Sequence, residues 1–163
     1  MTMTSVVSTA RAYEHGVDGS AGWRTESYPG IMLHPQPDPV GPGQESVWDY
    51  PRPPRVERVD RRAVITLGGD VIVDTDDVVR VLETSHPPTF YLPMADVDQA
   101  VLHRSERGSF CEWKGQAAYF HIVVDDVRAQ NAAWYYPTPT QSMAQLKDHI
   151  SLYPAMMERC VVG

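Results

Sequence analysis

Two short segments of the chain concentrate side chains that could do chemistry. The first carries Glu83 and His86 in the run Glu-Thr-Ser-His-Pro-Pro, and the second carries Cys111 and Lys114 in the run Cys-Glu-Trp-Lys-Gly. A carboxylate three residues from an imidazole can orient the ring, which then serves as a general base. The prolines and the glycine favour loops of fixed shape on a rigid scaffold. The two segments therefore predict an active site built on loops.

Each of these groups also has a plain structural interpretation, and the sequence leaves both open. Glu83 could bind backbone amides of the turn that follows it, and His86 could merely precede the two prolines. The ammonium of Lys114 could favour the thiolate of Cys111 and make it a nucleophile, which would be the route to a hydrolase or transferase. A single cysteine is more often a small buried hydrophobic residue, and Cys160 is interpreted in that way.

Two cations and a set of rings could hold an organic substrate near these groups. Arg52 lies in the stiff run Pro-Arg-Pro-Pro, which suits bidentate binding of a carboxylate or phosphate, and Lys114 offers a second contact for an anion. Aromatic side chains line concave pockets, although several must belong to the core of a domain of this size. The predicted substrate-binding rings are Trp48, Tyr50, Tyr91, Trp113, Tyr119, His121 and Trp134.

The sequence predicts no metal ion and no cofactor. The donors for a metal would be Glu83, His86, Cys111 and His121, but their spacing matches no ligand motif. The sequence also contains no glycine motif of the dinucleotide-binding or Walker type. Proton transfer of the lyase, isomerase or cyclase type therefore fits the chain better than redox chemistry.

The elements that must position these residues are mainly short strands. Apolar runs on either side of Gly68 and Gly69 predict a β-hairpin. Over residues 117–124 the side chains alternate, with Tyr119 and His121 on one face of the predicted strand. The predicted strands cover residues 64–67, 71–73, 90–92, 117–124 and 132–136.

Short helices complete the predicted fold. Aspartates at 74–77 could cap a helix that ends near Glu83, and a further helical turn is predicted from Asp96. Ser142 and Gln145 form a capping box, which predicts a C-terminal helix over 143–152. Short strands with tight turns and one late helix favour a mainly β domain, with a small antiparallel, barrel-like sheet.

Composition limits the function. The chain has 163 residues, a net charge of −7 and no stripe of Lys or Arg, which argues against nucleic acid and anionic membrane surfaces as partners. No apolar stretch approaches the roughly 20 residues of a membrane-spanning helix, and no secretory leader is visible. The two cysteines lack the spacing of a disulfide framework or zinc site. The sequence is therefore interpreted as that of a cytoplasmic protein.

Residues 1–45 differ from the rest because they are rich in Pro and Gly and lack apolar periodicity. They are predicted to form an arm before a single domain over 46–163. The arm is either a disordered leader or a segment that packs on the body or on a partner subunit. The residues that support packing, and with it a homo-oligomer, are Trp23, Tyr28, Ile31 and Leu33.

Several motifs together resemble a known family. They are the run Glu45 to Pro54, the two segments described first, the Ala133-Trp134 pair and Tyr153-Pro154. In this order, over about residues 45–163, they resemble domain-of-unknown-function family 427. The resemblance implies a compact, mainly β fold and no established activity.

The family is sometimes labelled a nucleotidyltransferase domain, and the sequence does not favour that activity. Nucleotidyl transfer by two metals requires a Gly-Ser turn followed by paired aspartates that bind Mg²⁺ and a triphosphate. Asp74 and Asp76 have the spacing, but the glycines before them predict a hairpin and no Gly-Ser turn precedes them. They are better interpreted as turn and capping residues.

The sequence thus predicts a cofactor-independent enzyme. Glu83 and His86 would do acid–base chemistry on an organic, anionic small molecule in an aromatic-lined pocket. The alternatives are a non-catalytic module that binds a small molecule in the same pocket, a hydrolase or transferase that uses Cys111, and a protein that docks a partner through residues 1–45.

Overall fold

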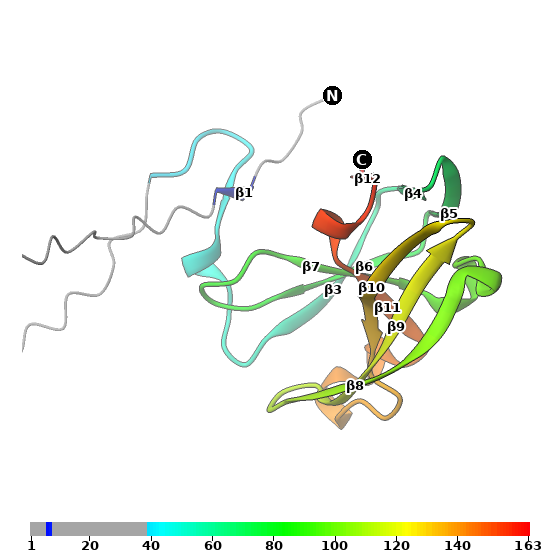
Figure 1. The fold of residues 1–163 in the computed structure, drawn as a ribbon. Helices are drawn as coiled ribbons and strands as arrows, with labels where there is room; N and C mark the ends of the chain where they lie inside the picture. Colours follow the sequence, from blue (N-terminus) through cyan, green and yellow to red (C-terminus); the bar gives the residue numbers. More distant parts are fainter. Residues whose placement is uncertain (1–5, 8–38) are drawn as a thin grey trace, which may run out of the picture.

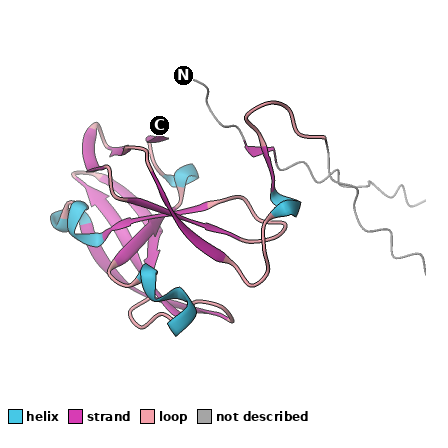
Figure 2. Cartoon of the chain, turned by 180° about the vertical axis from the view of Figure 1, so that it is seen from behind, coloured by secondary structure: helices cyan, strands magenta, loops and turns pink. Residues whose placement is uncertain are grey.

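Strands supply most of the structure, and the helical segments are short 3-10 segments (Figures 1 and 2). The computed structural model describes residues 6–7 and 39–163. The strands are β1 (Val6–Val7), β2 (Glu45–Ser46), β3 (Arg55–Val59), β4 (Ala63–Leu67), β5 (Asp70–Thr75), β6 (Val78–Leu82), β7 (Thr89–Pro93), β8 (Leu102–Cys111), β9 (Gly115–Val124), β10 (Val127–Tyr135), β11 (His149–Leu152) and β12 (Arg159–Val162). The 3-10 turns are η1 (Val47–Asp49), η2 (Met94–Asp96), η3 (Gln99–Val101), η4 (Gln141–Leu146) and η5 (Pro154–Met156).

The strands form one large sheet and one smaller sheet, and the short strands β1 and β2 pair in parallel beside them. The large sheet has the order β3-β6-β7-β11-β10-β9-β8, and all its neighbours are antiparallel. The smaller sheet has the order β12-β4-β5. Strands β3 and β8 are the free edges of the large sheet, so the antiparallel prediction is confirmed but the sheet does not close into a barrel.

The tight turn predicted at Gly68 and Gly69 is present, and a second tight turn follows β9. Gly68 and Gly69, with φ of 63° and 88°, join β4 to β5, as a two-residue hairpin of the I′ type requires. Asp125, with φ of 48°, begins the turn between β9 and β10. Along β9 the side chains of Phe120 and Ile122 enter one core cluster and that of Tyr119 enters another, which confirms the predicted alternation.

Two predicted helices are wrong. Residues 78–82 form strand β6, because β-branched side chains favour a strand and nearly every position of β6 is buried, on both faces of the sheet. The predicted C-terminal helix is instead the 3-10 turn η4 followed by strand β11. Asp148, with φ of 60°, interrupts any helix there, and Ile150 then contributes to a sheet and a core cluster.

The central strands of the large sheet carry a buried cluster on each face. One face packs on the smaller sheet through an aliphatic cluster that includes Ile65, Val73 and Ile122. The other face carries a cluster rich in tyrosine, which the turn η4 covers with Met143 and Leu146. The site residues can therefore be assigned to one side of this sheet or the other.

Most of the predicted arm, including Trp23, Tyr28, Ile31 and Leu33, lies outside the described residues. No helix in the described ranges has the length and hydrophobicity to cross a lipid bilayer.

Candidate functional site

The loop between β6 and β7 carries the first predicted motif, and backbone contacts fix its shape. The amide of His86 donates to the carbonyl of Glu83 at 3.0 Å, which closes a turn in which Ser85 has a φ of 67°. Residues 45–54, which surround η1 and are called the η1 segment below, hold this turn through two hydrogen bonds. The amide of Ser85 donates to the carbonyl of Val47 at 2.9 Å, and the hydroxyl of Thr84 donates to another carbonyl of the segment. The two segments lie side by side at one end of the sheet (Figure 1).

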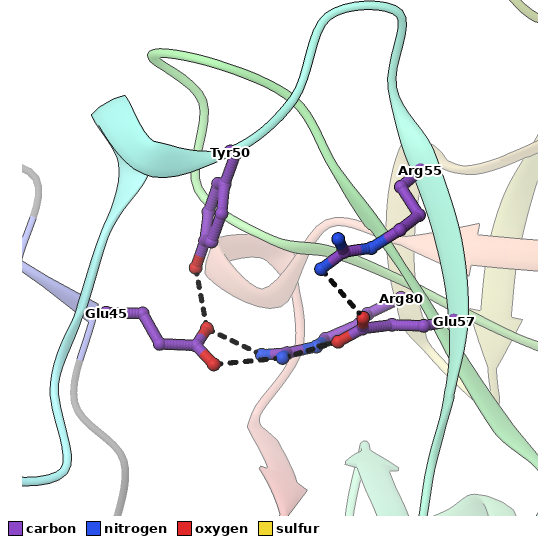
Figure 3. Close-up of polar contacts among 5 residues, drawn as sticks. All are labelled: Glu45, Tyr50, Arg55, Glu57 and Arg80. Atoms are coloured by element: carbon purple, nitrogen blue, oxygen red, sulfur yellow. Dashed lines mark hydrogen bonds and ion pairs between the residues drawn. The ribbon is translucent and has the colours of Figure 1, made fainter.

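A charged network fixes the η1 segment to the sheet (Figure 3). Arg80 of β6 binds Glu45 with two hydrogen bonds, of 2.8 and 3.0 Å, and donates from Nε to Glu57 of β3 at 2.6 Å. Tyr50 donates its hydroxyl proton to Glu45 at 2.8 Å, and Arg55 pairs with Glu57 at 3.1 Å. We call these five residues the Arg80 network. It links the segment that supports the loop to two strands of the large sheet.

The Arg80 network gives the protein a defined dependence on pH. The guanidinium of Arg80 holds the pKa of Glu45 below its ordinary value of 4.5. Because the folded-state pKa is the lower one, this stabilisation is present above pH 4.5 and is lost as pH falls through the lowered value. We expect the free energy of unfolding to fall less in Glu45→Gln than in the wild type when the pH is lowered from about 7 to about 3. Urea unfolding at the two pH values measures this difference.

The control for that experiment is Glu106→Gln, which removes an exposed carboxylate on β8. It should follow the wild-type pH dependence. A Glu45→Gln protein whose acid sensitivity equals that of the wild type would contradict the assigned role of Glu45.

The structure brings together three predicted residues that are far apart in the sequence. Glu83 accepts a hydrogen bond from Arg52 at 3.0 Å, and its second oxygen lies 3.8 Å from Nζ of Lys114. The side chains of Glu83 and Lys114 are only 15% and 10% exposed, so the carboxylate is enclosed between two cations. A separation of 3.8 Å is too long for a hydrogen bond. Glu83 therefore compensates the charge of Lys114 but accepts no hydrogen bond from it.

Lys114 reaches Glu83 because of the turn between β8 and β9. Gly115 has a φ of 99°, which a residue with a side chain rarely adopts. Thr140 then binds the turn twice, because its amide donates to the carbonyl of Lys114 at 3.2 Å and its hydroxyl donates to that of Trp113. The turn is thus held against the segment that leads into η4.

Glu83 and His86 do not form the predicted pair. The carboxylate of Glu83 is bound by cations, whereas Nδ1 of His86 lies 3.1 Å from the carbonyl oxygen of Thr84. A carbonyl can only accept, so Nδ1 carries a proton and the neutral ring keeps its free lone pair on Nε2. The backbone of its own loop, and not Glu83, sets the tautomer of His86.

His86 lies at a pocket of about 300 Å³ between the two sheets. The ladder between β7 and β11 is short, joining Leu92 to Ile150 and Pro93 to His149, and no further pairs join the two strands. Phe90, Ser151 and Leu152, which lie beyond these pairs, line the pocket. Its walls are mainly apolar and consist of Ile65, His86, Pro87, Pro88, Thr89, Phe90, Leu92, Trp134, Ser151, Leu152, Pro154, Cys160 and Val162.

Of the predicted site residues, only His86 and Trp134 line this pocket. Tyr91 is 1% exposed and belongs to the tyrosine-rich cluster, where its hydroxyl accepts a hydrogen bond from Trp134 at 3.3 Å. Burial raises the pKa of Tyr91, which marks it as a core residue. Cys111 and Trp113 are half-buried against the same cluster.

The remaining predicted rings lie elsewhere. Tyr119 shares a 2.9 Å hydrogen bond with Ser109 and lies under the guanidinium of Arg107, 4.7 Å from the ring centre. His121 accepts the amide of Asn131 on Nδ1 at 3.0 Å, at an irregularity between β9 and β10. The other two belong to the η1 segment, where Tyr50 is buried in the Arg80 network and Trp48 is 40% exposed.

Within residues 39–163, no group of three or more His, Cys, Asp and Glu side chains is arranged to hold a metal ion. Asp74 binds Arg62 through two contacts of 2.6 Å, and the amide of Asp77 donates to the hydroxyl of Thr75 in the turn before β6. Asp74 therefore forms an ion pair, and Asp77 belongs to a turn.

Sequence reasoning missed the residues that define the pocket, among them Phe90, Ser151 and Cys160. They come from β7, β11 and β12, and the last two of these strands were not predicted. Cys160 was interpreted as structural, and burial raises the pKa of its thiol. The apolar character of these residues predicts a core as readily as a pocket wall, so no signal in the sequence separates the two.

Comparison with known protein families gives a match. A family model described as a domain of unknown function (DUF427) matches residues 55–163, which confirms the resemblance found in the sequence. No curated protein matches the chain.

Proposed function

The chain belongs to the DUF427 family of unknown function, and on that premise we propose that it is an enzyme that does acid–base chemistry on a small organic molecule bound between its two sheets. The observation that carries the proposal is the position of His86 at the pocket, with Nδ1 fixed on the carbonyl of Thr84. Nε2 is then the atom that would take a proton from the ligand or return one to it.

The walls of the pocket support this role. The mainly apolar walls offer a bound molecule few competing polar groups, and His86 lies at the exposed edge of the pocket. Apart from His86, Cys160 is the only ionisable side chain among the lining residues, and burial raises the pKa of its thiol, which favours the neutral form. His86 is therefore the acid–base group of the proposed site. Glu83 has a positioning role, because it ties the start of the same loop to Arg52 and Lys114.

A second candidate function is binding without turnover. The apolar character of the walls favours it, since an apolar pocket can hold a ligand with no chemistry at all. Catalysis through Cys111 has less support, because Cys111 lies against the tyrosine-rich cluster and does not line the pocket.

Deuterium exchange can separate the two candidates without knowledge of the net reaction. A general base that removes a carbon-bound proton returns deuterium from D2O, and mass spectrometry detects the exchange. We would incubate the protein in D2O with a panel of neutral ring ketones and record both binding and exchange. We expect at least one bound ketone to exchange, and His86→Gln to slow that exchange by at least about 100-fold with little change in its affinity.

His149→Gln is the matched control. Nδ1 of His149 lies 2.8 Å from the carbonyl oxygen of Lys147, the same contact two residues back, but His149 does not line the pocket. This variant should exchange at the wild-type rate. Binding without exchange across the panel would favour the binding module, and equal loss in both variants would remove His86 from the mechanism.

A further inference from the structure

The charges around the pocket restrict what it can hold. The two cations that the sequence suggested for an anionic substrate, Arg52 and Lys114, both face Glu83 and neither lines the pocket. No lysine, arginine or carboxylate is among the lining residues. Burying an ionised group costs several kcal/mol or more unless a partner compensates its charge. A carboxylate, phosphate or sulfonate would therefore find no fixed counter-charge in this pocket.

One polar side chain of the wall is almost completely buried. Ser151 is 1% exposed and lines the pocket from β11, where it pairs with Trp134 of β10. A hydroxyl on the wall of a pocket can donate a hydrogen bond to a ligand or accept one from it. Ser151 is therefore a point at which one polar group of a ligand could be bound.

The size of the pocket limits the ligand further. A volume of about 300 Å³ is at the lower end of the range for small-molecule sites, which is about 300 to 1,000 Å³. The walls combine flat groups, such as Phe90 and Trp134, with stiff prolines from two loops. Such walls suit a compact, mainly aromatic body of up to about three rings.

We propose that the ligand of this pocket is an uncharged, mainly apolar ring compound whose one polar group forms a hydrogen bond with Ser151. The inference rests on the proposed function, because it concerns the same pocket, and it names the class of molecule that would reach His86. It replaces the anionic substrate that the sequence suggested with a neutral one.

Two probes with a common skeleton test the charge of the ligand. N-phenyl-1-naphthylamine is neutral and carries one N–H donor, and 8-anilinonaphthalene-1-sulfonate is the same molecule with an added sulfonate. Both fluoresce strongly in apolar surroundings. We expect the neutral probe to titrate to one site per chain with an affinity at least tenfold higher than that of the sulfonate. An equal or higher affinity for the sulfonate would overturn the neutral class while leaving a working pocket.

A matched pair of variants locates the probe. Val162 lines the pocket, while its neighbour Val161 on β12 is 36% exposed and does not line it. Val162→Trp should lower the affinity for the neutral probe at least tenfold, and Val161→Trp should change it less than twofold. Val162→Phe fills the pocket with a smaller ring and is the second variant if Val162→Trp does not fold. Unchanged affinity in folded Val162 variants would place the probe elsewhere and remove support from the proposed function as well.

The hydrogen bond at Ser151 has its own control. The compound 1-benzylnaphthalene replaces the N–H of the neutral probe with a methylene group of similar shape. Ser151→Ala should weaken binding of the amine about fivefold and leave that of 1-benzylnaphthalene unchanged, as expected for one hydrogen bond of about 1 kcal/mol. Competition between the two compounds gives both affinities from one fluorescence assay. Equal effects on the two compounds would remove Ser151 as the polar contact.

Discussion

Replacing Arg80 with methionine is expected to lower the free energy of unfolding by about 2–3 kcal/mol. The side chain of Arg80 is 19% exposed and lies between the carboxylates of Glu45 and Glu57. Methionine keeps much of the apolar stem but leaves two partly buried negative charges, about 30% and 36% exposed, without their shared partner. Removing one member of a buried pair is costly for this reason, and partial solvation places the loss below that of a fully buried pair.

Arg58→Met is the control for this prediction. Arg58 is on the same strand as Glu57 and pairs with Asp77 at 2.8 Å, but its side chain is 72% exposed. Exposed pairs contribute no more than about 1 kcal/mol, so this variant should stay close to the wild type. Urea unfolding followed by circular dichroism measures both. Similar losses in the two variants would mean that the Arg80 network stabilises the fold no more than a surface ion pair does.

Glu83→Gln should destabilise the protein more than Lys114→Met does, by about 2 kcal/mol. The two residues form one ion pair, but their surroundings differ. If Lys114 is replaced, Glu83 keeps Arg52 as a partner and methionine suits a site that is nine-tenths buried. If Glu83 is replaced, Lys114 keeps its charge and loses the only acidic partner it has among the described residues. The enclosed ammonium then has no compensating charge.

Urea unfolding of the two single variants and the double variant measures this asymmetry. The double variant should recover part of what Glu83→Gln loses, because it removes the uncompensated ammonium. If Glu83→Gln left stability unchanged but abolished deuterium exchange, Glu83 would have a role in proton transfer that its two cations argue against. Equal losses in the single variants would show that Arg52 contributes nothing to the pair.

Local patterns in the sequence predicted the parts of the fold that local chemistry decides. Gly68 and Gly69 predicted the β4–β5 hairpin, because few other residues adopt its φ values. Strand β6 was missed for the opposite reason. The aspartates before it resemble a helix cap, and only burial on both faces of the sheet makes its valines a strand. Strand β11 was missed in the same way, because the capping pattern of Ser142 and Gln145 predicted a helix that extended over its residues.

For the candidate site too, the sequence identified some of the residues but not the contacts between them. Residue types singled out Glu83, Arg52 and Lys114, and the structure brings them together. Their meeting depends on how the η1 segment and the β8–β9 turn pack against the end of β6, which no spacing in the sequence records. The pocket depends on residues of β7 and β11 that lie beyond the pairs joining the two strands, so Ser151 could be found only in three dimensions.

Contacts that support the β6–β7 loop come from residues outside the family match. The match begins at residue 55, yet Arg52 binds Glu83 from before that point, and Glu45 and Tyr50 complete the Arg80 network. A relative that shares residues 55–163 but differs before them would present the same β6–β7 loop without the same support. Substitutions in residues 45–54 could therefore change the support of the β6–β7 loop, and with it the position of His86 at the pocket, without changing the matched domain.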